Sequence, residues 1–287
     1  MKVFYRAEQA ARNTGAFAPS ADKPRLVMAD WLKQGLISRL DILSFEPVSR
    51  EDFKLAHDSS FVDGVLDLIR PNGFSNRDAE VAASLPYTTG SLLAAARYAL
   101  KHKTSVCSPT SGFHHAHYDQ PEGFCTFNGL MVVALKLKRE GLVNRVAIID
   151  CDVHYGDGTD DLICHHKIDW IQHYTLGRHF HDRDGVGKDA KHFLTWLYKA
   201  IADCQDADLV IYQAGADPHI NDPLGGVLTE LEMVQRDHAV FAGFRDRPLV
   251  WNLAGGYQRD AEGGIKPVLK LHRNTLSALQ AVELGHP

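Results

Sequence analysis

The sequence contains a short apolar run that leads directly into ionisable residues and glycines: Ile148-Ile149-Asp150-Cys151-Asp152-Val153-His154-Tyr155-Gly156-Asp157-Gly158. The apolar run, residues 146–149, is too short for a helix and rich in β-branched side chains, which predicts a buried strand. Side chains alternate along a strand, so Asp150, Asp152 and His154 are expected on one side. Buried carboxylates repel each other unless a cation or protons lie between them, and Asp and His are common metal ligands. The stretch therefore predicts a divalent metal site at a strand end, and a solvated loop is the simpler alternative.

The composition of the 287 residues is that of a globular protein, with 45% hydrophobic and 23% charged residues. A core of this size needs no disulfides, and five cysteines without a C-x-x-C pair indicate reduced thiols and a cytoplasmic location. The net charge of −5 gives no argument for nucleic-acid binding. Neither a signal-peptide core nor a run of about eighteen apolar residues is present, so we expect no membrane association.

Strand-like and helix-like segments alternate along the chain. Strands are expected at residues 3–5, 42–45, 104–108, 145–150, 168–172, 208–213 and 249–253. Helices are expected at residues 24–35, 87–102, 128–140, 160–166, 189–204 and 265–283, with others capped by Ser49, by Ser59 or Ser60, and by Thr229. Residues 71–86 carry Pro and Gly and are expected to form a loop. This alternation predicts a single α/β domain over residues 1–287, with a mostly parallel sheet and helices on both faces.

Unusual polar residues follow four of the expected strands. They are His114 and His115, then residues 150–157, then Asp217, and finally Tyr257. Because the carboxyl ends of parallel strands meet at one edge of a sheet, where α/β proteins bind ligands, we expect these residues to lie close together. Each signal is weak alone, but four signals at successive strand ends are hard to explain by chance.

The motifs at these strand ends resemble those of the histone deacetylase and acetylpolyamine amidohydrolase family, which has the arginase-deacetylase fold. The matching pieces follow in the family's order: Gly112-Phe113-His114-His115-Ala116, Glu122-Gly123-Phe124-Cys125, Asp150-x-Asp152-x-His154-x-Gly156-Asp157-Gly158, Gly215-Ala216-Asp217, Asp222-Pro223-Leu224-Gly225 and Gly255-Gly256-Tyr257. Together they span residues 112–257, and as a set they are highly specific.

The resemblance implies a metal site. Asp152, His154 and Asp217 would ligate zinc, and a structural potassium ion would lie beside Asp150, Asp152 and His154. Because the ligand set is rich in oxygen, Fe²⁺ or Co²⁺ could serve in place of zinc. Arginase-like ureohydrolases of the same fold bind two manganese ions, but their pattern needs a carboxylate where this chain has Gly156. A mononuclear site is therefore expected.

The resemblance also implies catalytic roles. His114 and His115 would be the tandem catalytic histidines, oriented by Asp150 and Asp157, and Tyr257 would donate to the scissile carbonyl. Elementary chemistry agrees with these roles. Three protein ligands leave an open metal position for water, a histidine can take the water proton and protonate the leaving amine, and a tyrosine hydroxyl stabilises the oxyanion.

A substrate tunnel is implied as well. Phe124 would line it, with Gly123 at its wall and Phe180 as the facing aromatic residue. An acid that grips the substrate at the rim would come from residues 71–86, where Asp78 and Glu80 are nearest. The expected partner is a small acylated amine or an acyl-lysine.

The sequence thus predicts a zinc-dependent amidohydrolase that removes an acetyl or other acyl group from acyl-lysine or acetylpolyamine. Two alternatives stay open: a non-catalytic module that binds acylated ligands, and a hydrolase of another small amide or ester. The acyl-chain length and the oligomeric state are also left open.

Overall fold

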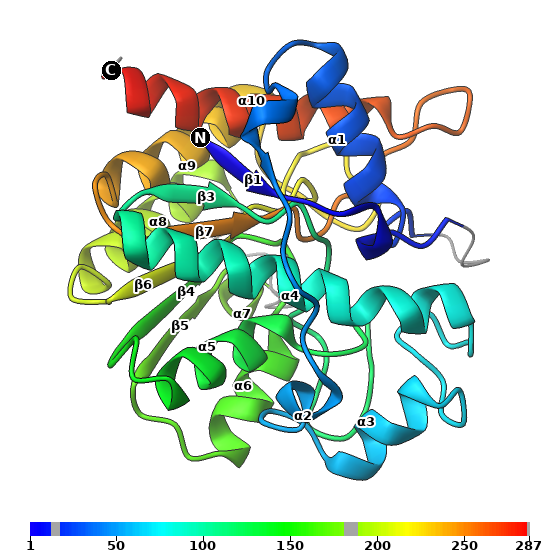
Figure 1. Ribbon diagram of the computed structural model, residues 1–287. Coiled ribbons are helices and arrows are strands. Elements are labelled where there is room, and N and C mark those ends of the chain that lie inside the picture. The colour runs from blue at the N-terminus through cyan, green and yellow to red at the C-terminus, as the bar shows by residue number, and fades with distance from the viewer. Residues whose placement is uncertain (13–17, 181–188, 286–287) are drawn as a thin grey trace.

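A computed structural model describes the chain over residues 1–12, 18–180 and 189–285. Within these ranges the strands form a seven-stranded sheet in the order β2-β1-β3-β7-β6-β4-β5, and every neighbouring pair is parallel (Figure 1). The strands are β1 Lys2–Phe4, β2 Ile42–Leu43, β3 Ser105–Cys107, β4 Val146–Asp150, β5 Ile171–Thr175, β6 Leu209–Gln213 and β7 Leu249–Asn252. The predicted parallel α/β architecture is confirmed.

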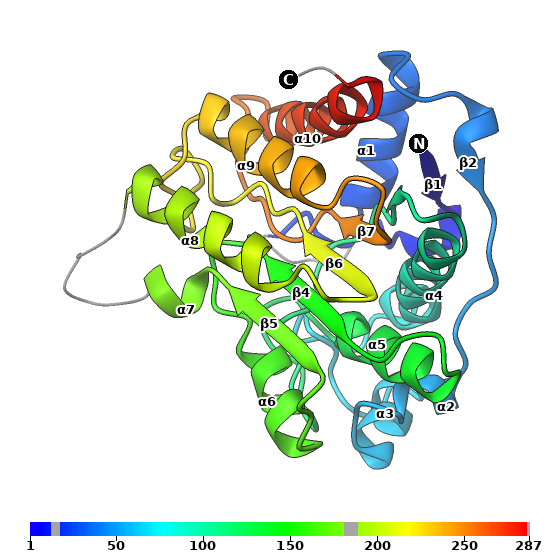
Figure 2. The same ribbon diagram turned by 90° about the vertical axis from the view of Figure 1, so that its left-hand side faces the viewer.

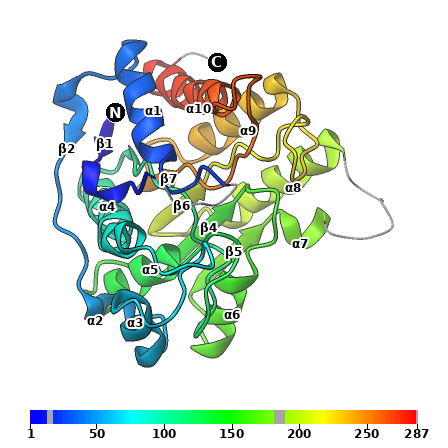
Figure 3. The ribbon, with the colours of Figure 1, turned by 90° about the vertical axis from the view of Figure 1, so that its right-hand side faces the viewer.

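Helices cover both faces of this sheet (Figure 2). One face carries α1 Lys23–Lys33, α8 Ala190–Asp203, α9 Glu230–Gly243 and α10 Lys266–Leu284. The other carries α2 Arg50–Phe53, α3 Ser59–Leu66, α4 Ala79–His102, α5 Gly129–Arg139 and α6 Asp157–His165. Short helical segments are η1 Ala7–Gln9, η2 Arg39–Asp41 and α7 Gly177–Phe180. Helix α2 contacts α5, and α3 contacts α4; in Figure 3, α2 and α3 lie below these two helices. Of the helices in the described ranges, none is both long and apolar enough to cross a membrane.

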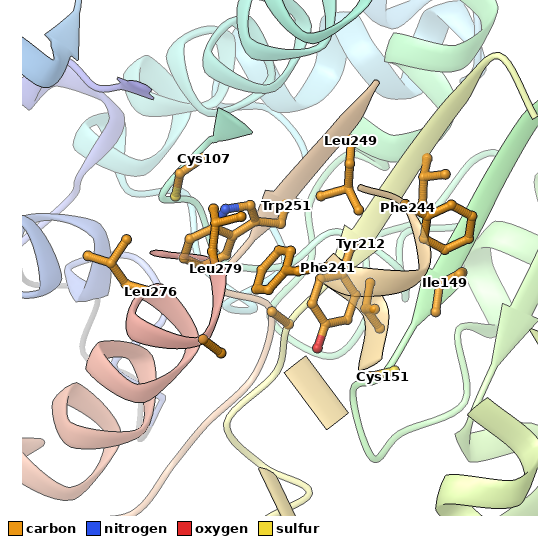
Figure 4. Packing of buried hydrophobic residues seen from close by; sticks show 14 of the residues in the cluster. Cys107, Ile149, Cys151, Tyr212, Phe241, Phe244, Leu249, Trp251, Leu276 and Leu279 are labelled. Atoms are coloured by element: carbon orange, nitrogen blue, oxygen red, sulfur yellow. The ribbon is translucent and has the colours of Figure 1, made fainter. Parts of the chain in front are cut away.

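The central strands are buried on both sides. In β7, Val250 packs into the apolar cluster under α4 and α5, and the next residue, Trp251, packs into the cluster under α9 and α10. Figure 4 shows Trp251 with Phe241 and Tyr212 in the second cluster; the ring centroid of Phe241 lies 5.9 Å from that of Trp251 and 5.7 Å from that of Tyr212. Burial on both faces explains the continuous apolar runs of these strands.

The order of the strands in the sheet brings the polar strand ends together. β4 follows β3 along the chain, but β7 and β6 lie between them in the sheet. β3, β7, β6 and β4 are therefore successive neighbours, and they are the strands that precede the four groups of polar residues. Open parallel sheets bind ligands at the carboxyl ends of strands near such a switch in strand order.

The expected loop over residues 71–86 is wrong in its second half. Helix α4 already begins at Ala79, and Pro86 lies inside it. The side chain of Asp78 caps the helix by accepting the N–H of Val81 at 2.9 Å. An early N-cap can therefore begin a helix ahead of a proline that local signals mark as a boundary.

Another predicted cap is also corrected. Helix α3 is capped by Asp58, whose carboxylate accepts a first-turn N–H at 2.9 Å, and not by Ser59 or Ser60. The caps of α2 and α9, Ser49 and Thr229, are confirmed, each as part of a capping box.

Candidate active site

Asp152 and His154 lie in the irregular segment between β4 and α6 and not on the strand. β4 ends at Asp150, so the predicted strand alternation of Asp150, Asp152 and His154 does not apply. Instead, Asp150 Oδ1 accepts the N–H of Asp152 at 3.2 Å, and Asp152 Oδ1 accepts the N–H of His154 at 3.0 Å. These local bonds fold the chain back so that successive polar side chains face the same point.

Asp152, His154 and Asp217 converge as expected. One ligand atom from each lies within 4.8 Å of the others. His154 Nδ1 is 2.9 Å from Asp152 Oδ1 and 3.0 Å from Asp217 Oδ2. Both carboxylates are buried, whereas His154 is partly exposed. The arrangement has the composition of a candidate metal site with three protein ligands.

The donors fit a divalent cation. Among the described residues, Asp217 Oδ1 is buried without a hydrogen-bond partner. Burial, and then the charge of Asp152, raise the pKa of Asp217 well above its ordinary value. Burial opposes a charged His154, yet its contacts with Asp152 and Asp217 raise its pKa to about 11. Two buried carboxylates thus draw positive charge to this point, and a divalent cation supplies it.

Each of the tandem histidines is paired with the expected carboxylate. His114 Nδ1 lies 2.7 Å from Asp150 Oδ2, and His115 Nδ1 lies 2.7 Å from Asp157 Oδ1. The two imidazole centroids are 4.1 Å apart, and that of His115 is 5.9 Å from that of His154. With each Nδ1 held by a carboxylate, both Nε2 atoms are left for chemistry beside the candidate ligands.

The environments of the two histidines push their pKa values in opposite directions. Burial works against a charged His114, but Asp150 and Asp152 outweigh it and raise the pKa of His114 to about 9. Burial, and then the charge of His114, lower the pKa of His115. At neutral pH His114 is therefore the cationic member of the pair and His115 the neutral one.

Tyr257 also lies beside the candidate ligands. Its ring centroid lies 6.1 Å from that of His154 and 6.1 Å from that of Phe124. Its backbone N–H donates to Asp222 Oδ2 at 2.8 Å. Burial, and then the charge of Asp152, raise the pKa of the Tyr257 hydroxyl well above its ordinary value. The phenol is therefore kept protonated and able to donate.

Lys23 is a residue of this site that sequence reasoning missed. It is fully buried, and its Nζ donates to the carbonyls of Ala254 at 2.5 Å and Gly255 at 2.9 Å. Burial lowers the pKa of Lys23 to about 8 against the opposing charge of Asp217. Lys23 thus holds the backbone that leads into Tyr257. It stands before a first-turn proline of α1, where no sequence motif marks it.

Of the three residues that were expected to line a substrate tunnel, Phe124 and Gly123 lie beside Tyr257 and His115, respectively. Phe124 has a φ of +64°, and its ring centroid lies 5.8 Å from that of Phe74, an aromatic neighbour that sequence reasoning did not single out. Gly123 lies against His115, because a Cβ at Gly123 would be 2.8 Å from His115 Cγ. Phe180 ends α7, and its side chain lies outside the described residues.

The rim holds a second group of titratable side chains. His117 Nε2 lies 3.3 Å from Glu122 Oε2, and His117 Nδ1 lies 3.5 Å from Asp161 Oδ2. Of the two candidate rim acids, Asp78 is used as the cap of α4, and Glu80 is exposed in the first turn. Neither is brought to the candidate ligands by a contact within the described part of the chain.

Comparison with known proteins shows the family. The model of the histone deacetylase domain matches residues 19–182, which is more than half of the chain. The chain therefore belongs to the histone deacetylase domain family. Its fold is similar to those of the HD domain of HDA15, at a TM-score of 0.76 and 19% identity, and of the acetylpolyamine aminohydrolase of Burkholderia pseudomallei, at 0.76 and 15%. The first alignment covers 100% of this chain and 91% of the other, and the second covers 98% and 99%. The predicted deacetylase fold is confirmed.

Relatives in sequence point to the same family. The chain is 26% identical to an uncharacterized protein of Picosynechococcus sp., over 88% of this chain and 90% of that protein. It is 26% identical to a probable deacetylase of Methanothermobacter thermautotrophicus, over 61% and 60%, and 24% identical to histone deacetylase 18 of Arabidopsis thaliana, over 84% and 42%. Membership of this family supports a deacetylase or amidohydrolase function. The roles of individual site residues, and the assignment of residues 1–287 to one catalytic domain, stay predictions.

Proposed function

We propose that this protein is a zinc-dependent amidohydrolase that removes an acetyl or other acyl group from an amine such as acyl-lysine or an acetylpolyamine. The observation that carries the proposal is the convergence of Asp152, His154 and Asp217 beside two histidine–aspartate pairs. Family membership supports the amidohydrolase reaction in general. The metal, the residue roles and the substrate are the parts proposed here.

Asp152, His154 and Asp217 would hold the metal. When bound, a zinc ion supplies a Lewis acid for the amide carbonyl and an activated water molecule. The oxygen-rich set would also accept Fe²⁺ or Co²⁺. A potassium ion beside Asp150 would serve the structure of the turn and not the reaction.

His115 would act as the base. Its lowered pKa leaves it neutral at neutral pH, so it can accept the proton of the attacking water and return it to the leaving amine. His114, whose ring the carboxylate of Asp150 holds through Nδ1, would present its Nε2–H beside the carbonyl oxygen, where negative charge develops. Asp150 and Asp157 orient the two rings through their Nδ1 atoms.

Tyr257 would donate its hydroxyl hydrogen to the same carbonyl oxygen, and Asp222 fixes its backbone. Phe124 and the neighbouring Phe74 would offer an aromatic wall to an alkyl chain such as that of lysine or a polyamine. A substrate of this kind presents its acyl amide at the end of a narrow chain, which suits a site recessed among buried residues.

The experiment that tests the proposal measures metal content and turnover together. Purified protein is expected to hold about one zinc or iron per chain and to release the amine from an acyl-lysine peptide or acetylputrescine, with loss of activity on chelation and recovery on zinc addition. Metal without turnover of any amide would favour the ligand-binding module. Turnover of an ester alone would contradict the amidohydrolase reaction, and absence of metal after reconstitution would contradict the metal site.

A further inference from the structure

Helix α9 buries a charged pair beneath the candidate metal site. Arg236 is 0% exposed and Asp237 is 1% exposed, and both belong to the buried residues of α9. Removing a guanidinium from water costs free energy unless partners satisfy it, and apolar residues often serve a core equally well. The contacts of Arg236 therefore indicate why a charge is kept at this position.

Arg236 contacts the backbone of both loops that carry the candidate carboxylate ligands. Its Nη1 donates to the carbonyl of Gly215 at 2.6 Å and lies 3.5 Å from the carbonyl of Cys151. Gly215 is two residues before Asp217, and Cys151 directly precedes Asp152. A single nitrogen atom thus links the turn after β6 to the turn after β4.

Asp237 fixes the orientation of this guanidinium. Asp237 Oδ1 accepts the Nε–H of Arg236 at 2.8 Å and lies 2.7 Å from its Nη2. The hydroxyl of Tyr212, on β6, also donates to Oδ1, and that of Thr275, on α10, donates to Oδ2 at 2.6 Å. The carboxylate is held from three elements, so the guanidinium has little freedom to turn.

We propose that Arg236, oriented by Asp237, is a positioning residue that preorganises the metal site. By holding the carbonyls of Gly215 and Cys151 it fixes the separation of the carboxylates of Asp217 and Asp152. The inference rests on the proposed function, since it takes these carboxylates as metal ligands. A purely structural ion pair would change the stability of the fold but not the affinity for the metal.

The test compares Arg236→Met, Arg236→Lys and Tyr212→Phe with the wild-type protein. Zinc affinity is measured by competition with a chromophoric chelator, and the ligand field by the visible absorption of bound Co²⁺. Arg236→Met is expected to weaken zinc binding by roughly 10–100-fold and to change the Co²⁺ spectrum, as changes behind metal ligands typically do. Arg236→Lys keeps a positive charge but lacks the planar guanidinium with its several donors, so its zinc affinity should lie between those of Arg236→Met and the wild type. Tyr212→Phe removes only one of the contacts that orient Asp237, so its zinc affinity should fall by less than that of Arg236→Met.

A matched control is Arg273→Met. Arg273 bridges α10 to α1 through an ion pair with Asp30, at 2.8 Å, and contacts neither loop. This variant should lower the unfolding temperature while leaving the zinc Kd and the Co²⁺ spectrum unchanged.

The possible outcomes separate this inference from the proposed function. A wild-type protein that binds neither ion contradicts the proposed metal site itself. A wild-type protein that binds zinc, with Arg236→Met binding equally well and with the same Co²⁺ spectrum, overturns the positioning role. If Arg236→Met fails to fold, as judged by circular dichroism, then Arg236→Lys and Tyr212→Phe decide, and wild-type affinity and spectra in both overturn it.

Discussion

At Tyr257 a single hydroxyl group is kept protonated by its surroundings, which fits it to donate to a developing oxyanion. Replacing Tyr257 by Phe removes this donor but no candidate metal ligand. The variant is expected to lose about 10²-fold or more in kcat, with an unchanged zinc Kd. Turnover of an acyl-lysine peptide and chelator competition measure the two quantities.

The control is Tyr198→Phe, the same substitution on the exposed side of α8. It is expected to leave both quantities unchanged. Wild-type kcat in Tyr257→Phe would show that the oxyanion role is assigned to the wrong residue.

The charge of Asp157 should affect the pH dependence of kcat/KM, because it acts on the pKa of His115. Only a neutral His115 accepts a proton, so kcat/KM should fall as the pH drops through its pKa, which burial and the charge of His114 lower from 6.5. The hydrogen bond and charge of Asp157 oppose that lowering. Asp157→Asn removes the anion that favours imidazolium, so the acid limb of the kcat/KM profile is expected to move to lower pH. A limb that moves to higher pH, or stays in place, would exclude His115 as the base.

At the scale of elements, the start of α9 depends on one side chain. The hydroxyl of Thr229 accepts a first-turn N–H and donates to Glu232 Oε2 at 2.8 Å. Thr229→Ala is expected to lower the free energy of unfolding by about 1 kcal/mol, measured by urea denaturation. As a control, Thr195→Ala lies in the exposed middle of α8 and should stay within about 0.5 kcal/mol of wild type. An equal loss in both variants would mean that the cap contributes nothing specific.

The strands show which elements could be predicted from the sequence. β4 and β6 are buried on both faces, so their apolar runs mark them to within one residue: 145–150 and 208–213 were expected, and Val146–Asp150 and Leu209–Gln213 are found. β5 was expected at 168–172 but is Ile171–Thr175. It lies at the edge of the sheet, several of its side chains are only half-buried, and its position is set by one-to-one pairing with β4. The pattern of hydrophobic residues within this segment does not specify how the strand aligns with β4.

At the scale of the whole molecule, the candidate site could be predicted only where its residues follow strands in short motifs. The order of β3, β7, β6 and β4 then brings those motifs together. Lys23 and Arg236 carry no motif. Lys23 is 231 residues from Ala254 in sequence, and Arg236 is 85 residues from Cys151. Contacts of such separation arise from the packing of α1 and α9 on the sheet, which a single sequence does not specify locally.

The buried carboxylates couple the stability of the whole fold to the metal. A carboxyl whose pKa is raised on folding opposes folding at neutral pH, because the unfolded chain is ionised there, and the opposition grows as the pH rises toward the folded pKa. Asp217 is such a group. Asp217→Asn removes the charge at nearly constant volume, so the chelated variant is expected to be at least as stable as the chelated wild type. Zinc should raise the unfolding temperature of the wild type, by roughly 4–5 °C at 100 times its Kd, and leave that of the variant almost unchanged.

Thermal unfolding with chelator and with excess zinc, on both proteins, gives the four temperatures that are needed. Asp222→Asn is the control, because Asp222 is also buried but contacts the backbone of Tyr257 and not the candidate ligands. In Asp222→Asn, zinc should raise the unfolding temperature by as much as it does in the wild type. If zinc stabilises Asp217→Asn as much as the wild type, Asp217 is not a ligand. The chelated Asp217→Asn protein could instead have a much lower unfolding temperature than the chelated wild type. Asp217 would then stabilise the metal-free fold by its own contacts, and the expected cost of burying its carboxyl would be wrong.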